Sequence, residues 1–192
     1  MTVEEMHQIF TCLPEMETER LHMRRLLPSD TLDMFEYASM ASVTEYLLWQ
    51  EHPNVQYTRE YLEYLESRYA VGDFYDWALV LKESGKMIGT CGFTSIDLVN
   101  NSAEIGYVIN PAYHGMGIAP EAAKKVVSFG FSTLELSRIS AVCMKENERS
   151  LRVMKKVGMS YEGLLRSAVY AKGKHRDVCL CAITKADFDA LN

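Results

Sequence analysis

A short turn in the middle of the chain carries the residues best suited to chemistry. In residues 110–122, NPAYHGMGIAPEA, Gly115 and Gly117 stand just before a helix-like stretch. Glycines ahead of a helix can expose backbone N–H groups, and the helix N-terminus adds partial positive charge, so the arrangement suits a phosphate or pyrophosphate. Pro120 fits the first helical turn, because its missing N–H would have no partner inside the helix. The turn is a candidate anion site, but two glycines alone also fit a plain strand-to-helix connection.

Two well-known phosphate-binding motifs fit this turn poorly. A nucleoside triphosphatase loop ends in Gly-Lys-Ser/Thr, whereas Gly117 is followed by Ile118 and Ala119. A dinucleotide fold needs a third glycine where Pro120 stands, and it needs the glycines directly after the strand. Glu146 could serve as the acid of such a fold, but three antiparallel strands are expected directly before the turn rather than after it. A nicotinamide dinucleotide enzyme is therefore the weakest interpretation.

The elements that must hold this turn follow from periodicity and turn residues. The N-terminal half predicts a strand within 16–27 that ends near Leu27, helices over 31–40 and 58–70, and strands within 74–98, folded at ESGK, and 103–109. The C-terminal half predicts a helix over 119–130, a strand at 138–144, a helix from Asn147 to Gly158, and two strands within 159–184. This order indicates a mixed α/β sheet.

The composition is that of an ordinary compact domain. The chain has 192 residues, 48% hydrophobic and 24% charged, which suits one hydrophobic core and argues against disorder. No apolar run approaches the ~20 residues of a membrane span, and the opening MTVEEMHQIF is acidic where a secretory signal would be basic. The five cysteines do not have the spacing of a zinc site, so no metal is expected. Their odd number favours reduced thiols and a cytoplasmic location. A net charge of −6 argues against nucleic acid and favours a cationic substrate.

Several segments, taken in order, carry a resemblance to a known family. They are ETERLHMRRLLPSD (17–30), VTEYLLW (43–49), AEIGYVINPAYHGMGIAPEA (103–122), NERSLRVMKKVGMSYEG (147–163) and KGKHRDV (172–178). With them the chain resembles the GCN5-related N-acetyltransferase (GNAT) superfamily, in its ribosomal-protein N-terminal (RimJ/RimL-like) acetyltransferase branch. The resemblance implies an α/β (α+β) fold, with a mixed, mostly antiparallel twisted sheet flanked by helices and one strand splayed at the coenzyme site. It also implies a single N-acetyltransferase domain at 17–187, between an N-terminal extension, 1–16, and a C-terminal tail, 188–192.

The resemblance assigns acetyl-CoA to the splayed strand and the turn. Pantetheine would lie along the backbone of Val108, Ile109 and Asn110. The pyrophosphate would meet the N–H groups of Gly115, Met116, Gly117, Ile118 and Ala119. Family turns often begin with Gln or Arg where this chain has His114, whose mostly neutral imidazole adds less charge beside the phosphates. Asn147 matches a residue that contacts the coenzyme near its thiol, and it is equally suited to cap its helix.

Acetyl transfer needs a neutral amine, donors for the developing oxyanion and a proton for the departing thiolate. The resemblance places backbone N–H groups from Tyr107 to Ile109 at the thioester carbonyl. Glu104 is the candidate base, or else an exposed strand carboxylate. Ser150 is the candidate partner of the thiolate, or else a capping residue in the first turn of its helix, and Tyr107 is the alternative proton donor.

Other residues narrow the mechanism. Many superfamily members carry a proton-donating tyrosine at the position of Met154, whose side chain has no proton to donate. Cys143 lies in an apolar strand without an adjacent histidine, so direct attack by the amine is expected rather than an acyl-enzyme. Cys179 and Cys181 are expected to fill the core rather than to bind a ligand.

The acceptor pocket is expected between the early helices, the loop LLWQEHPN and the late hairpin. Aromatic walls with carboxylates suit an amine, and they are supplied by Tyr46, Trp49, Glu51, Phe74, Tyr75 and Asp76, whereas Trp77 is expected in the core. An α-amine with a pKa of ~7.7 needs less help from a base than a lysine side chain with a pKa of ~10.4. The expected function is acetyl transfer from acetyl-CoA to the N-terminal α-amine of a protein or peptide. The alternative acceptor is a small amine, a polyamine or an antibiotic. The alternative function is that of a noncatalytic acyl-CoA-binding module. The expected oligomeric state is a monomer or a homodimer.

Overall fold

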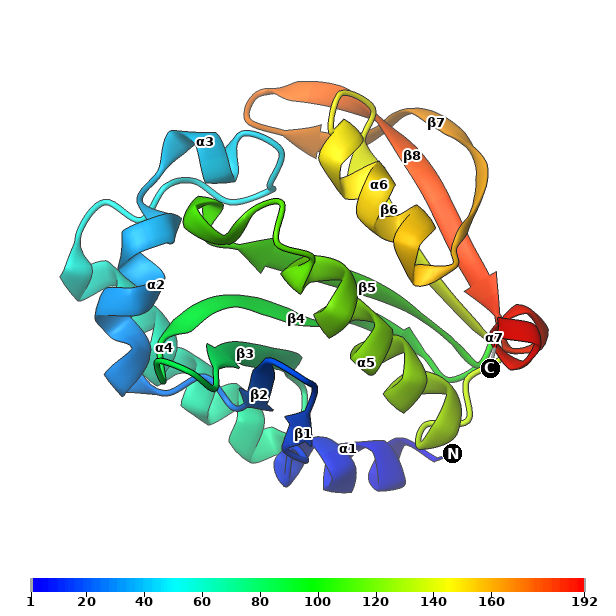
Figure 1. Cartoon of the computed structure of the whole chain (residues 1–192), viewed down its shortest axis with the longest axis horizontal. Coiled ribbons are helices and arrows are strands. Elements are labelled where there is room, and N and C mark those ends of the chain that lie inside the picture. Colours follow the sequence, from blue (N-terminus) through cyan, green and yellow to red (C-terminus); the bar gives the residue numbers. More distant parts are fainter. Residues whose placement is uncertain (1, 192) are drawn as a thin grey trace.

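The computed structural model describes residues 2–191, which form one eight-stranded sheet with helices on both faces (Figure 1). The helices are α1 (Val3–Thr11), α2 (Thr31–Ala38), α3 (Ala41–Thr44), α4 (Val55–Val71), α5 (Ile118–Ser132), α6 (Glu148–Val157) and α7 (Lys185–Leu191). The strands are β1 (Met16–Glu17), β2 (Leu21–Arg24), β3 (Tyr75–Leu81), β4 (Met87–Asp97), β5 (Ser102–Ile109), β6 (Arg138–Met144), β7 (Ser160–Ala171) and β8 (Lys174–Thr184). Residues 1 and 192, the ends of the expected N-terminal extension and C-terminal tail, lie outside the described residues.

The sheet is mixed and mostly antiparallel, as the sequence predicts. Its strand order is β1-β2-β3-β4-β5-β6-β8-β7, and only the central β5–β6 pair is parallel. The helix α5 makes the crossover between these two strands, so the turn at 110–117 lies at the end of β5, where the chain leaves the sheet. The parallel pair therefore divides the sheet into an N-terminal and a C-terminal half.

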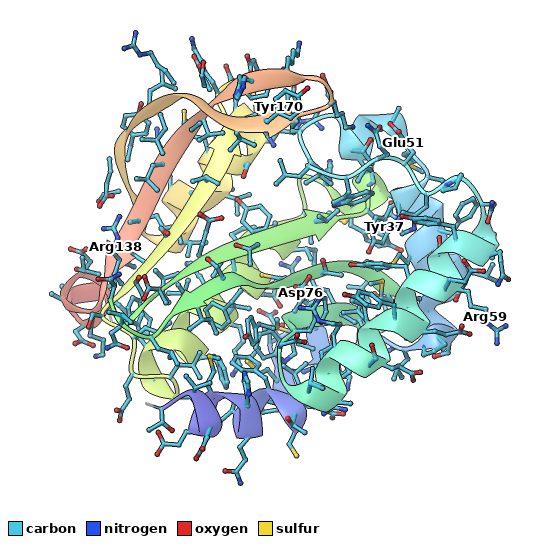
Figure 2. The ribbon with its side chains drawn as sticks, turned by 180° about the vertical axis from the view of Figure 1, so that it is seen from behind. Tyr37, Glu51, Arg59, Asp76, Arg138 and Tyr170 are labelled. Atoms are coloured by element: carbon cyan, nitrogen blue, oxygen red, sulfur yellow. The ribbon has the colours of Figure 1, made fainter. Side chains whose placement is uncertain are left out.

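The two faces of the sheet are covered by different helices. Figure 1 shows α5 and α6 on the near face, and Figure 2 shows α4 on the far face. Trp77 of β3 points to the α5 side, where its ring lies 5.4 Å from that of Phe129, and it is fully buried as expected. Trp77 is paired with Cys91 of β4, which is paired with Tyr107 of β5, so these three side chains point to the same face.

The predicted elements are present, and the structure adds α1, α3 and α7, which the sequence did not predict. The first strand does not run to Leu27, because Asp30 binds the Arg24 guanidinium with both carboxylate oxygens and accepts the Leu27 N–H. These bonds turn the chain out of the sheet after Arg24. The helix α1 was not predicted, although Met6 and Phe10 lie one helical turn apart and are buried, and a Thr2–Glu5 capping box starts the helix.

Four of the five cysteines are buried and all are free, and Cys179 and Cys181 lie in the core on β8 as expected. No helix within residues 2–191 is both long and apolar enough to cross a lipid bilayer.

Candidate active site

The central feature of the site is the parting of β5 from β6. The two strands pair only from Ser102 with Arg138 to Glu104 with Ser140. Beyond that point β5 stays paired with β4 as far as Ile109, and β6 stays paired with β8 as far as Met144. The last five residues of β5 therefore have no strand partner on the β6 side, and the predicted splayed strand is confirmed.

The backbone of β5 directs polar groups into this gap. The Asn110 N–H donates to the Ile88 carbonyl of β4 at 2.8 Å. The Val108 carbonyl also points to β4, since its oxygen lies 2.2 Å from the position that a Cβ atom would take if Gly89 had one. Because backbone groups alternate sides along a strand, those of Tyr107 and Ile109 face the gap. The Ile109 carbonyl accepts a hydrogen bond there from His114 Nε2 at 2.9 Å. The gap is lined by strand backbone, as pairing with an extended ligand requires.

The turn after β5 is held by the Asn110 side chain. Its Oδ1 accepts the Ala112 N–H at 3.0 Å, its Nδ2 donates to Glu36 of α2 at 2.9 Å, and the residue is buried. The Asn110 N–H donates to Ile88 and its carbonyl accepts the Tyr113 N–H at 2.9 Å, so both its side chain and its backbone are engaged within the chain.

The two glycines give the turn its shape. Gly115 and Gly117 have φ values of 80° and 78°, in the left-handed region that other residues adopt at a cost. Among the hydrogen bonds within residues 2–191, none is donated by the backbone N–H groups of residues 115–119, at the start of α5. Five consecutive N–H groups without an acceptor thus precede and begin a helix, which fits the diphosphate that the sequence predicts there.

A cation that the sequence did not indicate lies at the mouth of the gap. Arg149, in the first turn of α6, lies with Nη1 3.5 Å from His114 Nδ1. Since His114 Nε2 donates to a carbonyl, Nδ1 of a neutral ring is the acceptor that faces the guanidinium. Tyr46 lies close by: its pKa is raised, first by desolvation and then by Glu45 and Glu146, while Arg149 opposes the shift. The only sequence signal for Arg149 was its place in the segment NERSLRVMKKVG.

Tyr107 and Ser150 meet across the gap. The Tyr107 hydroxyl lies 2.8 Å from Ser150 Oγ and donates to the Ser150 carbonyl at 3.1 Å. Burial raises the pKa of Tyr107, while the hydrogen bond to Ser150 lowers it in part. Asn147 caps α6 by accepting the Ser150 N–H at 3.1 Å, so its capping role is confirmed. Cys143 lies near the same serine, and burial raises its pKa to about 11, which leaves it a protonated thiol at neutral pH.

Glu104 points to the other face of the sheet. It lies on the same side of β5 as Gly106, which is paired through Gly92 with Asp76 on the face that α4 covers (Figure 2). Its Oε1 accepts the Thr94 hydroxyl at 3.1 Å. The predicted base, at the last β5–β6 pair before the gap, and the predicted proton donors therefore lie on opposite faces of the sheet.

The acceptor residues from the early loop lie beside the late hairpin. Glu51 accepts the Thr44 hydroxyl at 2.6 Å, and Lys172 of the β7–β8 turn donates to the Thr44 carbonyl at 2.7 Å. The pKa of Glu51 is lowered, chiefly by the hydrogen bond from Thr44 and in smaller part by Lys172. Figure 2 shows Glu51 and Tyr170 at the neighbouring ends of these two segments. Contact between the early loop and the late hairpin is thus as expected.

The remaining acceptor candidates lie in packed surroundings. Trp49 packs against His52 at 5.5 Å, Tyr75 packs against Phe10 of α1 at 4.5 Å, and Phe74 packs against Tyr69 of α4 at 5.1 Å. The structure does not bring Tyr75 together with Glu51. Burial raises the pKa of Asp76 to about 7, against a smaller opposing effect of Thr90 and the Trp77 N–H. Its Oδ1 accepts no hydrogen bond within the described chain.

In the part of the chain that the structure describes, no three His, Cys, Asp or Glu residues are grouped as metal ligands would be.

Comparisons with known proteins agree with this geometry. Residues 20–160 match the family profile described as an acetyltransferase (GNAT) domain. An uncharacterized N-acetyltransferase, p20, from Bacillus licheniformis is 33% identical over 171 residues, which are 89% of this chain and 96% of that protein. The crystal structure of a GNAT-family acetyltransferase from Bacillus anthracis aligns with a TM-score of 0.81 at 28% identity, over 90% of this chain and 99% of that one.

Two further proteins carry names that state an acceptor. The spermidine N(1)-acetyltransferase of Escherichia coli is 29% identical over 159 residues, which are 81% of this chain and 83% of that protein. RimL, a ribosomal L7/L12 α-N-protein acetyltransferase solved in complex with coenzyme A, aligns with a TM-score of 0.75 at 21% identity, over 89% of this chain and 98% of that one. At that identity the likeness to RimL concerns the fold alone.

Proposed function

The chain belongs to the GNAT family of N-acetyltransferases, and from that membership we propose that it transfers acetyl from acetyl-CoA to the N-terminal α-amine of a protein or peptide. The observation that carries the proposal is the parting of β5 from β6 beside a turn whose N–H groups, at residues 115–119, have no acceptor in the described chain. We also propose that it acts in the cytoplasm, as a monomer or homodimer.

In this proposal, groups of the chain itself bind the pantetheine arm and the diphosphate of the coenzyme. The backbone of Tyr107 and Ile109 pairs with the amides of pantetheine in the gap, once His114 releases the Ile109 carbonyl. The five N–H groups from Gly115 to Ala119 hold the diphosphate, and Arg149 adds the positive charge that His114 lacks when neutral. Acetyl-CoA supplies the acetyl thioester, whose carbonyl carbon is the electrophile.

Each proton of the reaction has a candidate group. Glu104, on the α4 face, takes a proton from the acceptor amine directly or through water as the nitrogen attacks the carbonyl carbon. The strand N–H groups at the gap stabilise the charge that develops on the carbonyl oxygen. Ser150, on the opposite face, hydrogen-bonds the departing thiolate sulfur or relays a proton to it from the Tyr107 hydroxyl, and water returns that proton to the pair after product release. In this proposal the amine approaches from the α4 face, while the thiol leaves beside Ser150 on the opposite face.

The acceptor is proposed from the chemistry of the amine. Near pH 7.4 an α-amine is neutral in roughly a third of molecules, whereas a lysine side chain is neutral in roughly one in a thousand, which favours the α-amine when one carboxylate is the base. A polyamine is the second candidate, because the carboxylates of Glu45, Glu51 and Glu146 lie near the acceptor side and because a spermidine acetyltransferase is among the relatives.

The test is a thiol-release assay with acetyl-CoA, preceded by calorimetry with acetyl-CoA and NADH. We expect micromolar binding of acetyl-CoA, no binding of NADH, and faster turnover with peptides that begin with Ser or Ala than with spermidine or aminoglycosides. The same peptides with acetylated N-termini are the control and should give no thiol. Turnover of spermidine alone would reject the α-amine acceptor, and binding without turnover of any amine would leave a noncatalytic acyl-CoA-binding module.

A further inference from the structure

A network of hydrogen bonds joins the turn between β1 and β2 to the first helical turn of α5. The Glu121 carboxylate accepts the Thr18 hydroxyl at 2.5 Å, the Arg20 N–H at 3.0 Å and Arg20 Nε at 2.7 Å, and it forms an ion pair with Arg20 Nη2 at 2.6 Å. Burial would raise the pKa of Glu121, but these donors outweigh it and the pKa is lowered. The carboxylate is therefore ionised and fully engaged by a segment 101 residues away.

Arg20 also reaches the coenzyme turn itself. Its Nη1 donates to the Met116 carbonyl at 2.7 Å, and its Nη2 lies 3.5 Å from the place that a Cβ on Gly117 would take. By contrast, nothing lies within 4 Å of the place of a Cβ on Gly115. One guanidinium thus holds the carbonyl between the two glycines and the carboxylate of the helix that follows.

This arrangement bears on an anion at the turn in two ways. Glycines at positive φ lose much conformational freedom when they are fixed, so a turn held before binding costs less to order when the ligand arrives. A carboxylate in the first turn of α5 would repel an anion at the same helix end, and the Arg20 charge offsets that of Glu121. Both effects act through Met116 and Glu121, without requiring Arg20 to touch the ligand.

We propose that Arg20 is a positioning residue for the coenzyme diphosphate: it holds the Met116 carbonyl and neutralises Glu121, so that the N–H groups of residues 115–119 stay directed at the anion. The inference rests on the proposed function for the identity of that anion. It also explains why the segment ETERL, which supplies no group to the proposed reaction, contributes Thr18 and Arg20 to the site.

The first test needs no ligand. In ligand-free protein, Arg20→Met should lower the NMR order parameters of the Gly115 and Gly117 N–H vectors, because the Met116 carbonyl loses its donor. Arg59→Met is the matched control, since Arg59 forms an exposed ion pair with Glu63 on α4 and points away from the sheet (Figure 2). Unchanged order parameters in Arg20→Met would show that Arg20 does not hold the turn in place, whether or not the chain binds coenzyme A.

The second test measures coenzyme A binding and turnover. Arg20→Met should raise the Kd for coenzyme A and the KM for acetyl-CoA together by about tenfold, with kcat within about twofold of the wild type. Arg20→Lys keeps the positive charge but loses the forked guanidinium donors, so it should recover part of the lost affinity for coenzyme A. The double variant Arg20→Met/Glu121→Gln should recover the part of the loss that comes from the unpaired Glu121 carboxylate. An unchanged Kd, or a loss in kcat and Tm with no change in Kd, would overturn the proposal. If the wild type itself binds no coenzyme A, the proposed function fails instead.

Discussion

The Tyr107 hydroxyl of β5 lies 2.8 Å from Ser150 Oγ of α6, and this hydrogen bond spans the gap where β5 has left β6. It is a polar side-chain contact between the two halves of the sheet at the proposed reaction centre. In the proposed mechanism this pair takes the role of proton donor, because Met154, buried in α6, has no proton to donate. The two hydroxyls therefore act as one unit, and removing either should have much the same effect as removing both.

A double-mutant cycle tests this unit. Tyr107→Phe and Ser150→Ala should each lower kcat by roughly 10- to 100-fold, and the double variant should be no slower than the slower single variant. The Kd for coenzyme A should change less than about threefold in all three variants, because the proposed diphosphate site lies at residues 115–119, away from both hydroxyls. Strictly multiplicative losses in kcat would show that the two residues act independently.

Glu104→Gln tests the base on the opposite face. The variant keeps the shape of the side chain and its contact with Thr94 but cannot take a proton, so kcat at neutral pH should fall by roughly 10- to 100-fold. The loss should shrink as the pH rises toward the pKa of the acceptor amine, which then arrives neutral. Glu83→Gln, in the exposed β3–β4 turn, is the control. A Glu104→Gln enzyme with the wild-type rate at pH 7 would remove Glu104 from the mechanism.

Gly117→Ala tests the backbone of the coenzyme turn. A Cβ at this position has room, since its nearest neighbour would be Arg20 at 3.5 Å, so the effect comes from the φ of 78°. The strain is about 1–2 kcal/mol, which should raise the Kd for coenzyme A severalfold if the turn relaxes out of this conformation.

Gly173→Ala is the matched control for that variant, because Gly173 has a φ of 81° and open space around it in the β7–β8 turn. It should lower the Tm to a similar extent and leave the Kd for coenzyme A unchanged. Equal effects of the two variants on coenzyme binding would count against the turn as the diphosphate site.

Asp76 should give the stability of the protein a distinctive pH dependence. Burial raises its pKa in the folded state to about 7, above the value of about 3.9 expected in the unfolded chain. Between these values the folded state holds the proton more tightly, so the contribution of Asp76 to stability falls as the pH rises from about 4 to 7. The slope is at most about 1.4 kcal/mol per pH unit.

Urea unfolding at pH 5 and pH 7.5 checks this dependence. Asp76→Asn should remove most of the fall in the free energy of unfolding between the two pH values. Asp97→Asn is the control at an exposed carboxyl, whose pKa is lowered chiefly by the Asn100 N–H. For a lowered pKa the sign is opposite, and stability is lost as the pH falls. An Asp76→Asn profile parallel to that of the wild type would mean that Asp76 is ionised throughout this range.

Arg149→Met should weaken coenzyme A binding through loss of charge rather than loss of structure. Arg149 is exposed beside His114, so the Kd should rise by about three- to tenfold at low salt, and the difference from the wild type should shrink at 0.5 M salt. Titration calorimetry at the two salt concentrations measures both effects. A loss that is independent of salt would indicate a packing role instead.

Local patterns in the sequence were sufficient for most of the elements and for the position of the glycine turn. Helical spacing marked α5, Asn147 and Gly158 marked the ends of α6, and the paired glycines marked the turn, because each signal depends on residues a few positions apart. Such signals are weakest where charged residues surround few apolar ones. This is why α1 was missed and why the turn that ends β2, made by Arg24 and Asp30, was placed too late.

What only the tertiary structure decided is which side chains meet at the gap. Tyr107 and Ser150 are 43 residues apart, His114 and Arg149 are 35 apart, and Arg20 and Glu121 are 101 apart. These contacts follow from the parallel placement of β6 beside β5 and from the position of the β1–β2 turn against α5, neither of which is encoded by local spacing. The sequence by itself determined the chemical groups and the turn that presents its N–H donors. The fold decided their partners, because long-range contacts depend on how complete elements pack.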